Sequence, residues 1–242
     1  MERKVISEDK SQRAIKGMFD RIAPTYDLLN HTLSFSIDKG WRKKTIKEMR
    51  IREHDLVMDL AAGTGDMGLL ALQLCRNCNV VGIDLSSNML RLAQKKRDKK
   101  GDGVPYSLVS GDSYSLPFRD ETFDSAMVSF GIRNMEDIPM ALVQIRRVLK
   151  AGGTLAILEF AMPRNPFARL VYSAYFKGLL PIVGRIISGD VSAYRYLPGS
   201  INSFFSAEEM DMMITESGFS LRKSIGLFPG ISHLYVAGRI EA

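Results

Sequence analysis

One stretch, Leu56–Asp66, constrains the fold more than any other part of this 242-residue sequence. It begins with a short apolar run, which is the pattern of a buried strand, and it breaks into glycines at positions 63 and 65. A leucine-rich segment with the pattern of a helix follows. Because glycine has no Cβ, such a turn can curve sharply and let a ligand lie against the main chain. The stretch therefore predicts a strand, a ligand-binding turn and a helix start.

Two kinds of ligand suit this turn. The dinucleotide fingerprint G-x-G-x-x-G is matched by Gly63, Gly65 and Gly68. The acidic Asp84 stands about 20 residues further on, as that fingerprint requires. However, Asp59 and Asp66 place carboxylates on both sides of the turn, where they suit a cationic ligand better than a pyrophosphate. The charges favour S-adenosylmethionine, which carries a sulfonium and an ammonium group; a glycine turn without any cofactor is the remaining alternative.

Beyond the turn, strand-like and helix-like segments alternate along the chain. Strands are predicted at 79–84, 104–110, 121–130, 154–159, 220–227 and 232–240. This alternation predicts one α/β domain with a mostly parallel sheet and helices on both faces. Residues 11–22 carry apolar side chains at helical spacing before the first strand, the position of a lid. Ser206 and Glu209 predict a capping box at the start of the last helix.

Composition and charge limit the classes of function. The chain has 33 Lys and Arg against 27 Asp and Glu, an excess that favours an anionic surface of lipid or nucleic acid. The basic run at 95–100 has no interleaved aromatic residues to stack on bases, so nucleic acid is not expected as a partner. Cys75 and Cys78 have no second pair beside them, and we expect no metal. With no signal peptide and no apolar run of ~18 residues, a cytoplasmic protein is expected.

The order Asp59, Gly63-Thr64-Gly65 and Asp84 resembles that of the class I S-adenosylmethionine-dependent methyltransferases. The resemblance implies a Rossmann-like, seven-stranded, mostly parallel sheet. It also implies that Asp84 holds the ribose hydroxyls and that Asp112 faces the adenine amino group. The cofactor-binding residues expected on this basis are Asp59, Gly63, Thr64, Gly65, Asp84, Asp112, Ser113 and Ser129.

Further stretches resemble the ubiquinone/menaquinone biosynthesis C-methyltransferases, a family that methylates a quinol ring carbon. They include Tyr26-Asp27, Asn30, Leu33-Ser34, Trp41, Arg147–Lys150, Gly152-Gly153, Glu159 and several positions between Tyr172 and Pro198. One departure is Asp38, which stands where the family often has a histidine. The resemblance implies a single methyltransferase domain over 1–242, divided into N-terminal lid helices (1–50), a cofactor-binding core (51–160), a substrate-side helical insertion (161–205) and a closing helix with strands (206–242).

On this resemblance we expect C-methylation of a prenylated quinol, with demethylmenaquinol as the acceptor. Arg133 follows the fourth predicted strand, and because a guanidinium stays protonated, it is expected to stabilise a quinol oxyanion or polarise a water. Tyr26, Asp27 and Asn134 are its expected helpers. A lipid acceptor implies peripheral contact with the inner face of the membrane, through the apolar face 167–180. The oligomeric state, with a homodimer as one option, stays open.

Two other functions remain open at this point. One is a methyltransferase acting on RNA or another small molecule, which the missing base-stacking clusters disfavour. The other is a non-catalytic regulator that binds S-adenosylmethionine. Polar residues on the acceptor side argue against a regulator, since binding alone has no need of them.

Overall fold

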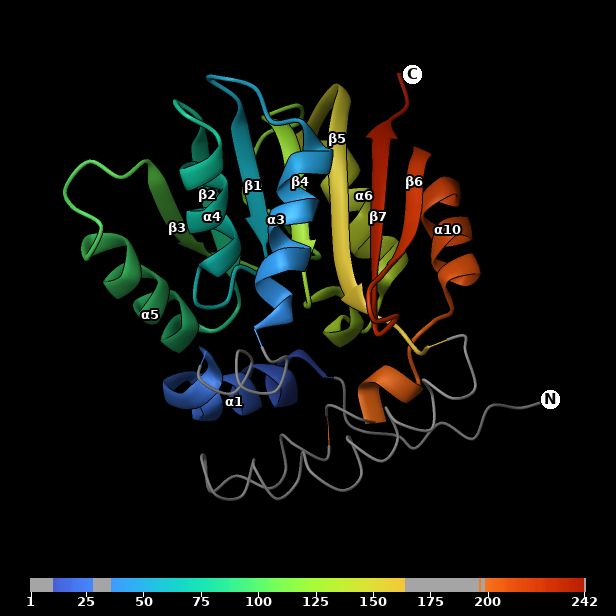
Figure 1. The fold of residues 1–242 in the computed structure, drawn as a ribbon, viewed down its shortest axis with the longest axis horizontal. Coiled ribbons are helices and arrows are strands. Elements are labelled where there is room, and N and C mark those ends of the chain that lie inside the picture. The colour runs from blue at the N-terminus through green and yellow to red at the C-terminus, as the bar shows by residue number, and fades with distance from the viewer. Residues whose placement is uncertain (1–10, 28–35, 164–195, 197–198, 242) are drawn as a thin grey trace.

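The computed structural model describes residues 11–27, 36–163, 196 and 199–241 as a helix-covered sheet (Figure 1). The sheet has seven strands in the order β3-β2-β1-β4-β5-β7-β6. Their bounds are β1 Leu56–Leu60, β2 Asn79–Asp84, β3 Tyr106–Ser110, β4 Phe123–Ser129, β5 Leu149–Phe160, β6 Phe219–Leu227 and β7 Ser232–Arg239. Strands β1 to β5 run parallel, and β7 pairs antiparallel with both β5 and β6. The predicted mostly parallel sheet is confirmed.

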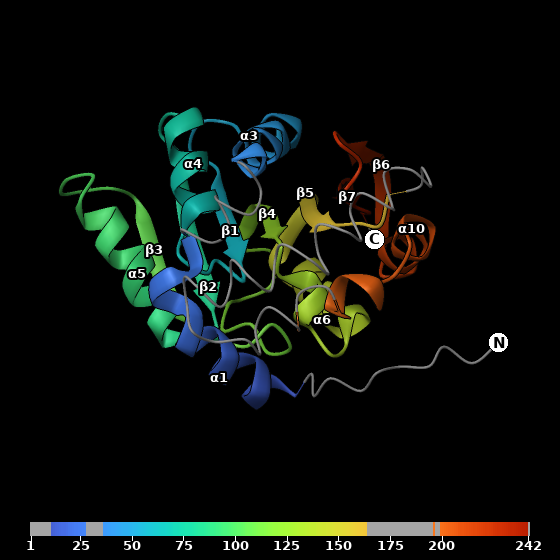
Figure 2. The same cartoon turned by 60° about the horizontal axis from the view of Figure 1, so that its bottom comes forward.

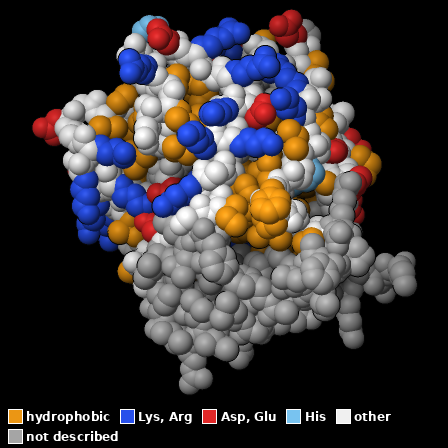
Figure 3. Space-filling view, viewed as in Figure 1, with side chains coloured by type: hydrophobic (Ala, Val, Ile, Leu, Met, Phe, Trp, Pro, Cys, Tyr) orange, Lys and Arg blue, Asp and Glu red, His pale blue; other side chains and the backbone are white. Residues whose placement is uncertain are grey.

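The helices cover the sheet on two sides. They are α1 Gln12–Ile22, η1 Ala23–Thr25, α3 Ile37–Met49, α4 Asp66–Leu74, α5 Ser87–Asp98, η2 Ile132–Asn134, α6 Ile138–Val148 and α10 Ala207–Glu216. Helices α3 and α4 lie on one face, while α6 and α10 lie on the other (Figures 1 and 2). On its outward side α3 carries lysine side chains. Lys and Arg side chains gather on this face of the molecule (Figure 3). Helix α1 lies across the carboxyl edge of the parallel strands, the position predicted for a lid.

Local sequence signals account for most of these bounds. The capping box is confirmed: Ser206 N–H donates to Glu209, and Glu209 N–H donates to the Ser206 hydroxyl. Among the strand bounds the largest difference is in β5, which begins at Leu149 and not at 154. A register shift in its pairing with β4 absorbs Gly152, whose φ is +70°, within the strand. Most of 161–205 lies outside the described residues, as do Asn30, Leu33-Ser34 and the apolar face 167–180.

Tyr106 fills the space beneath the glycine turn. A Cβ at Gly68 would lie 2.5 Å from Cζ of this ring, and one at Gly82 would lie 2.7 Å from its hydroxyl oxygen. A Cβ at Gly65 would lie 3.0 Å from the ring. In contrast, a Cβ at Gly63 would meet nothing within 4 Å. Two glycines of the fingerprint therefore make room for a tyrosine ring, and only Gly63 leaves open space beside the turn.

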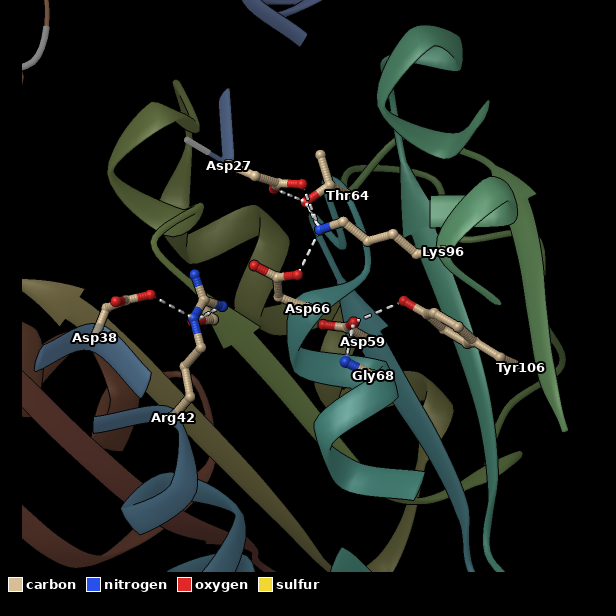
Figure 4. Close-up of polar contacts among 10 residues, drawn as sticks. Asp27, Asp38, Arg42, Asp59, Thr64, Asp66, Gly68, Lys96 and Tyr106 are labelled. Atoms are coloured by element: carbon tan, nitrogen blue, oxygen red, sulfur yellow. Dashed lines mark hydrogen bonds and ion pairs between the residues drawn. The ribbon is translucent and has the colours of Figure 1, made fainter. Parts of the chain in front are cut away.

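The hydroxyl of Tyr106 is anchored on Asp59 (Figure 4). It donates to Oδ2 of Asp59 at 3.0 Å, and the backbone N–H of Gly68 donates to the same oxygen at 2.9 Å. Burial raises the pKa of Asp59 to about 7, although these two hydrogen bonds and the charge of Arg42 oppose the rise. Asp59 therefore points inward and joins β1, β3 and α4.

Alanine at Gly68 should destabilise the protein, because its Cβ and the Tyr106 ring cannot occupy the same space. Overpacking of this kind costs about 1–3 kcal/mol. Gly40→Ala in α3 is the matched control, since a Cβ there would meet nothing within 4 Å. That change should stabilise the protein by up to about 1 kcal/mol, the helix-propensity gain of alanine over glycine. Urea unfolding of both variants measures the changes in the free energy of unfolding, which should have opposite signs. Stabilisation by Gly68→Ala would contradict the packing described.

The raised pKa of Asp59 predicts that its contribution to stability falls as the pH rises from about 4 to about 7. In this window the folded protein keeps a proton that the unfolded chain has released, so the slope is negative and at most about 1.4 kcal/mol per pH unit. Asp59→Asn removes this titration and keeps an acceptor for both donors. Relative to wild type, the variant should therefore gain free energy of unfolding between about pH 5 and pH 8. A difference that does not change with pH would contradict the buried, protonatable Asp59.

Candidate functional site

A cavity opens at the carboxyl edge of the sheet, where ligands bind in open α/β folds. The ends of four parallel strands and the N-terminal segment line it. Its walls include Leu60, Ala61 and Gly63 after β1; Asp84, Leu85 and Ser86 after β2; Gly111, Asp112, Ser113 and Tyr114 after β3; Ser129, Phe130 and Gly131 after β4; and Ile15, Phe19 and Tyr26 from the N-terminal segment. The cavity therefore lies between the sheet edge and the predicted lid.

Asp84 fixes one wall of this cavity. Its Oδ2 accepts the backbone N–H of Gly63 at 2.7 Å, and its Oδ1 accepts the backbone N–H of Ser86 at 2.8 Å. Burial raises the pKa of Asp84, and these two backbone hydrogen bonds oppose the rise. The carboxylate thus ties the glycine turn to the end of β2 and presents acceptor oxygens to the cavity. Such a group can bind a pair of hydroxyls.

A second polar wall follows β3. Asp112 accepts the backbone N–H of Tyr114 at 2.9 Å, which shapes a tight turn beside Ser113. The hydroxyl of Tyr114 accepts the backbone N–H of Asp137 at 2.9 Å and so ties this turn to the start of α6. Tyr114 was not predicted as a site residue, because its partner is 23 positions away. This wall offers a carboxylate and main-chain groups to a ligand.

The predicted site residues divide into two groups. Those that line the cavity are Tyr26, Gly63, Asp84, Asp112, Ser113, Ser129 and Asn134. Those that lie behind its walls are Asp27, Asp59, Thr64, Gly65 and Arg133. For the second group, a direct contact with cofactor or acceptor stays a prediction, while the structure gives each of them another partner.

Thr64 of the glycine turn and Asp27 of the N-terminal segment belong to one polar cluster (Figure 4). The Nζ of Lys96 in α5 lies 2.6 Å from Asp27, 2.5 Å from Asp66 and 2.9 Å from the Thr64 hydroxyl. The Thr64 hydroxyl in turn donates to Asp27 at 2.5 Å. Lys96 belongs to the basic run at 95–100, and it joins the N-terminal segment to the turn. Asp27 therefore holds the lid and does not line the cavity.

A second contact holds α1 against α5. The Asp20 carboxylate accepts hydrogen bonds from the Ser86 hydroxyl at 2.5 Å and from Lys16 at 2.6 Å. Burial alone would raise the pKa of Asp20, but the hydrogen bonds from Lys16 and Ser86 lower it overall. Ser86 also caps α5 and lines the cavity beside Asp84. The lid is thus anchored at the residues that follow β2.

Arg42 supports the wall that follows β4. Its Nη1 donates to the Ser129 hydroxyl at 3.2 Å, and its guanidinium lies 5.2 Å from the centre of the Phe130 ring. Its Nε donates to Asp38 at 3.4 Å, and both side chains are buried (Figure 4). The aspartate that replaces the family's frequent histidine is thus an ion-pair partner of Arg42. Sequence patterns did not indicate Arg42, because Ser129 lies 87 positions away.

Arg133 lies behind the cavity wall and is 5% exposed. Its Nη1 donates to Oε1 of Glu159 and to the carbonyl of Phe130, each at 2.7 Å. Its guanidinium lies 5.3 Å from the centre of the Phe160 ring. Burial alone would lower the pKa of Arg133, but the Glu159 carboxylate raises it overall. An ion pair with Glu159 thus holds the charge of Arg133, and a direct contact between Arg133 and the acceptor stays a prediction.

Asn134, next to Arg133, does reach the cavity. Its Oδ1 accepts a hydrogen bond from the hydroxyl of Tyr196 at 2.9 Å. Tyr196 is buried, and it packs in a cluster with Met18, Ile22 and Met89. This contact joins Asn134 to the segment that precedes α10, and the sequence did not mark Tyr196 as a site residue.

Comparisons with known proteins agree over nearly the whole chain. A model of the ubiE/COQ5 methyltransferase family matches residues 6–237. A demethylmenaquinone methyltransferase from Bacteroides fragilis is 39% identical over 231 residues, which cover 96% of this chain and 94% of that protein. A ubiquinone/menaquinone biosynthesis C-methyltransferase from Geotalea uraniireducens is 40% identical, over 92% of this chain and 94% of that protein. A crystal structure of a SAM-dependent methyltransferase from Aquifex aeolicus shares the fold, with a TM-score of 0.61 and 17% identity over 82% of this chain and 89% of that one.

These matches decide between the two ligands that the glycine turn allowed. The cofactor is S-adenosylmethionine and not a dinucleotide, and the protein is a methyltransferase, not a regulator that merely binds it. The expected class I Rossmann-like fold is confirmed by the sheet and by the solved relative. With its glycine turn, its carboxyl-edge cavity and a match over residues 6–237, the chain belongs to the ubiE/COQ5 methyltransferase family.

Proposed function

We propose that this enzyme transfers the methyl group of S-adenosylmethionine to a ring carbon of demethylmenaquinol. The observation that carries the proposal is the composition of one cavity. Its β2 and β3 sides offer Asp84 and Asp112, whereas its other side offers Tyr26, Phe130 and Asn134. Carboxylates suit the hydroxyl and amino groups of a nucleoside, and an aromatic wall with a few polar groups suits a hydroxylated ring. Relatives at 39–40% identity are named for this reaction or for quinone C-methylation.

Each part of the cofactor has a proposed partner among the residues that line the cavity. Asp84 would accept the two ribose hydroxyls, Asp112 would face the adenine amino group, and Ser113 would add a main-chain contact. The open space beside Gly63 admits a ligand against the backbone, since a Cβ there would meet nothing within 4 Å. When bound, the cofactor supplies an electrophilic methyl group on a sulfonium.

On the acceptor side, the residues have to orient the ring and favour ionisation of the hydroxyl next to the reacting carbon. Tyr26 and Asn134 line the cavity and are the groups proposed to contact the quinol. Arg133 acts as a positioning residue, because it fixes the carbonyl of Phe130 and the buried Glu159 behind them. Such a site works by orientation and by charges set in advance.

The acceptor's prenyl tail requires access to lipid. None of the helices that the described part of the chain forms is both long and apolar enough to cross a bilayer. We propose that the enzyme meets its acceptor by peripheral contact at the inner face of the membrane, because a prenyl tail lies in lipid.

Purified enzyme should transfer a labelled methyl group from S-adenosylmethionine to a short-chain demethylmenaquinol, giving menaquinol. Mass spectrometry of the product identifies the methylated ring carbon. The same mixture with a transfer RNA in place of the quinol should stay unlabelled, and cells that lack the gene should accumulate the demethylated quinone. Labelled RNA together with unlabelled quinol would contradict the proposal.

The same assay separates two roles for Arg133. Arg133→Met leaves Glu159 buried without its cation and should cost about 3–5 kcal/mol of stability. Adding Glu159→Gln removes the stranded charge and keeps one of the two acceptor oxygens, which can still accept the backbone N–H of Phe160, although the acceptor for the backbone N–H of Arg133 is lost. If Arg133 only positions its neighbours, the double variant should recover most of both stability and turnover. If the double variant recovers its stability but its turnover stays about 100-fold or more below wild type, Arg133 instead stabilises the oxyanion directly.

A further inference from the structure

The outward side of α3 is a basic surface that the methyl-transfer site does not use. Its exposed residues include Lys39, Lys43, Lys44 and Lys47, and Arg50 follows the helix. The opposite side carries buried residues such as Trp41 and Ile46, which pack on the sheet. Because Lys39, Lys43 and Lys47 are spaced four residues apart, they form one row along the helix. Figure 3 shows cationic side chains gathered over α3 on this face of the molecule.

Acidic side chains hardly reduce the charge of this surface. Asp38 is 3% exposed and forms its ion pair inside the protein with Arg42. Glu48 is half-buried, and Lys223 neutralises it at 2.5 Å. The row of lysines therefore presents a net positive charge to its surroundings.

An exposed aromatic side chain lies at the end of this surface. Phe228, in the turn between β6 and β7, is 84% exposed, more than any other large hydrophobic residue of the described chain. The indole Nε1 of Trp41 in α3 donates to the carbonyl of Phe228 at 2.7 Å, which fixes the turn beside the helix. In Figure 3 the hydrophobic patch at this turn lies directly below the cationic side chains.

We propose that the α3 face, formed by Lys39, Lys43, Lys44, Lys47, Arg50 and Phe228, docks on an anionic lipid bilayer. Lysines attract acidic headgroups, and an aromatic ring can enter the interface between headgroups and acyl chains. Nucleic acid fits this surface less well, since binding along a strand uses several aromatic side chains and this face offers one.

The position of the α3 face suits the reaction. Helix α3 begins at the carboxyl edge of the sheet, the edge at which the cavity opens, and the β6–β7 turn lies at the same edge (Figure 1). Docking through this face would thus bring the cavity edge close to the lipid. The biological purpose of the contact rests on the proposed lipid acceptor, but the binding itself depends only on charge and on Phe228.

Flotation with vesicles of phosphatidylglycerol and phosphatidylcholine, in the absence of any acceptor, tests the surface. The triple variant Lys39→Gln, Lys43→Gln, Lys47→Gln should bind roughly 100-fold more weakly than wild type, because each lysine near an anionic surface contributes about a fivefold factor. The matched control is Lys95→Gln, Lys99→Gln, Lys100→Gln, which removes the same charge from the exposed end of α5. The control should bind within about threefold of wild type, since its lysines lie outside the docking face.

A second pair of variants tests the aromatic contribution. Phe228→Ser should weaken vesicle binding about tenfold. Met212→Ser on α10 also removes an exposed apolar side chain, but it should leave vesicle binding unchanged. Methyl transfer to a short-chain soluble acceptor should be unchanged in all of these variants, so failure of the surface and failure of the proposed reaction are distinguished. No flotation of wild type at low salt, or equal losses for the α3 and α5 triple variants, would overturn the proposal.

Discussion

The contact between Tyr106 and Asp59 organises the rest of the site. A ring from β3 crosses beneath β2 and the glycine turn, and its hydroxyl meets a carboxyl group from β1. The ring fits only because Gly65, Gly68 and Gly82 have no side chains there. Helix α4 consequently lies close to the sheet, and the main chain at Gly63 is left facing the cavity. The fingerprint glycines differ in what they allow: Gly65 and Gly68 permit close packing of Tyr106, and Gly63 leaves the open space proposed for the cofactor.

Two aspartates at the ends of neighbouring strands have opposite orientations. Asp59 of β1 is turned inward, where its partners are Tyr106 and the N–H of Gly68. Asp84 of β2 lines the cavity and shapes the turn through the N–H of Gly63. The lid is attached beside them, through the ion pairs of Lys96 and the hydrogen bond between Asp20 and Ser86. The proposed cofactor site and the contacts that hold α1 thus share the same short segments of chain.

The sequence predicted the strands well, because parallel strands are continuous apolar runs and glycines interrupt them. Local signals also predicted the capping box at Ser206 and the lid helix at 11–22. The inward orientation of Asp59 could not be predicted, since β1 is buried on both faces and shows no alternation. The roles of Lys96 and Arg133 depend on partners 30 and 26 positions away, which no local pattern reveals. The strand β5 begins five residues earlier than predicted, because a register shift accommodates Gly152-Gly153 within it.

Calorimetric titration of S-adenosylmethionine into Asp84→Asn, Asp59→Asn and wild type measures how much each aspartate contributes to cofactor affinity. At about pH 8 the account predicts that Asp84→Asn weakens binding about 10-fold or more, as expected when a charged acceptor of hydrogen bonds is lost. Asp59→Asn should stay within about threefold of wild type, because its carboxyl group faces Tyr106 and not the cavity. Loss of affinity in Asp59→Asn with normal binding by Asp84→Asn would contradict the account.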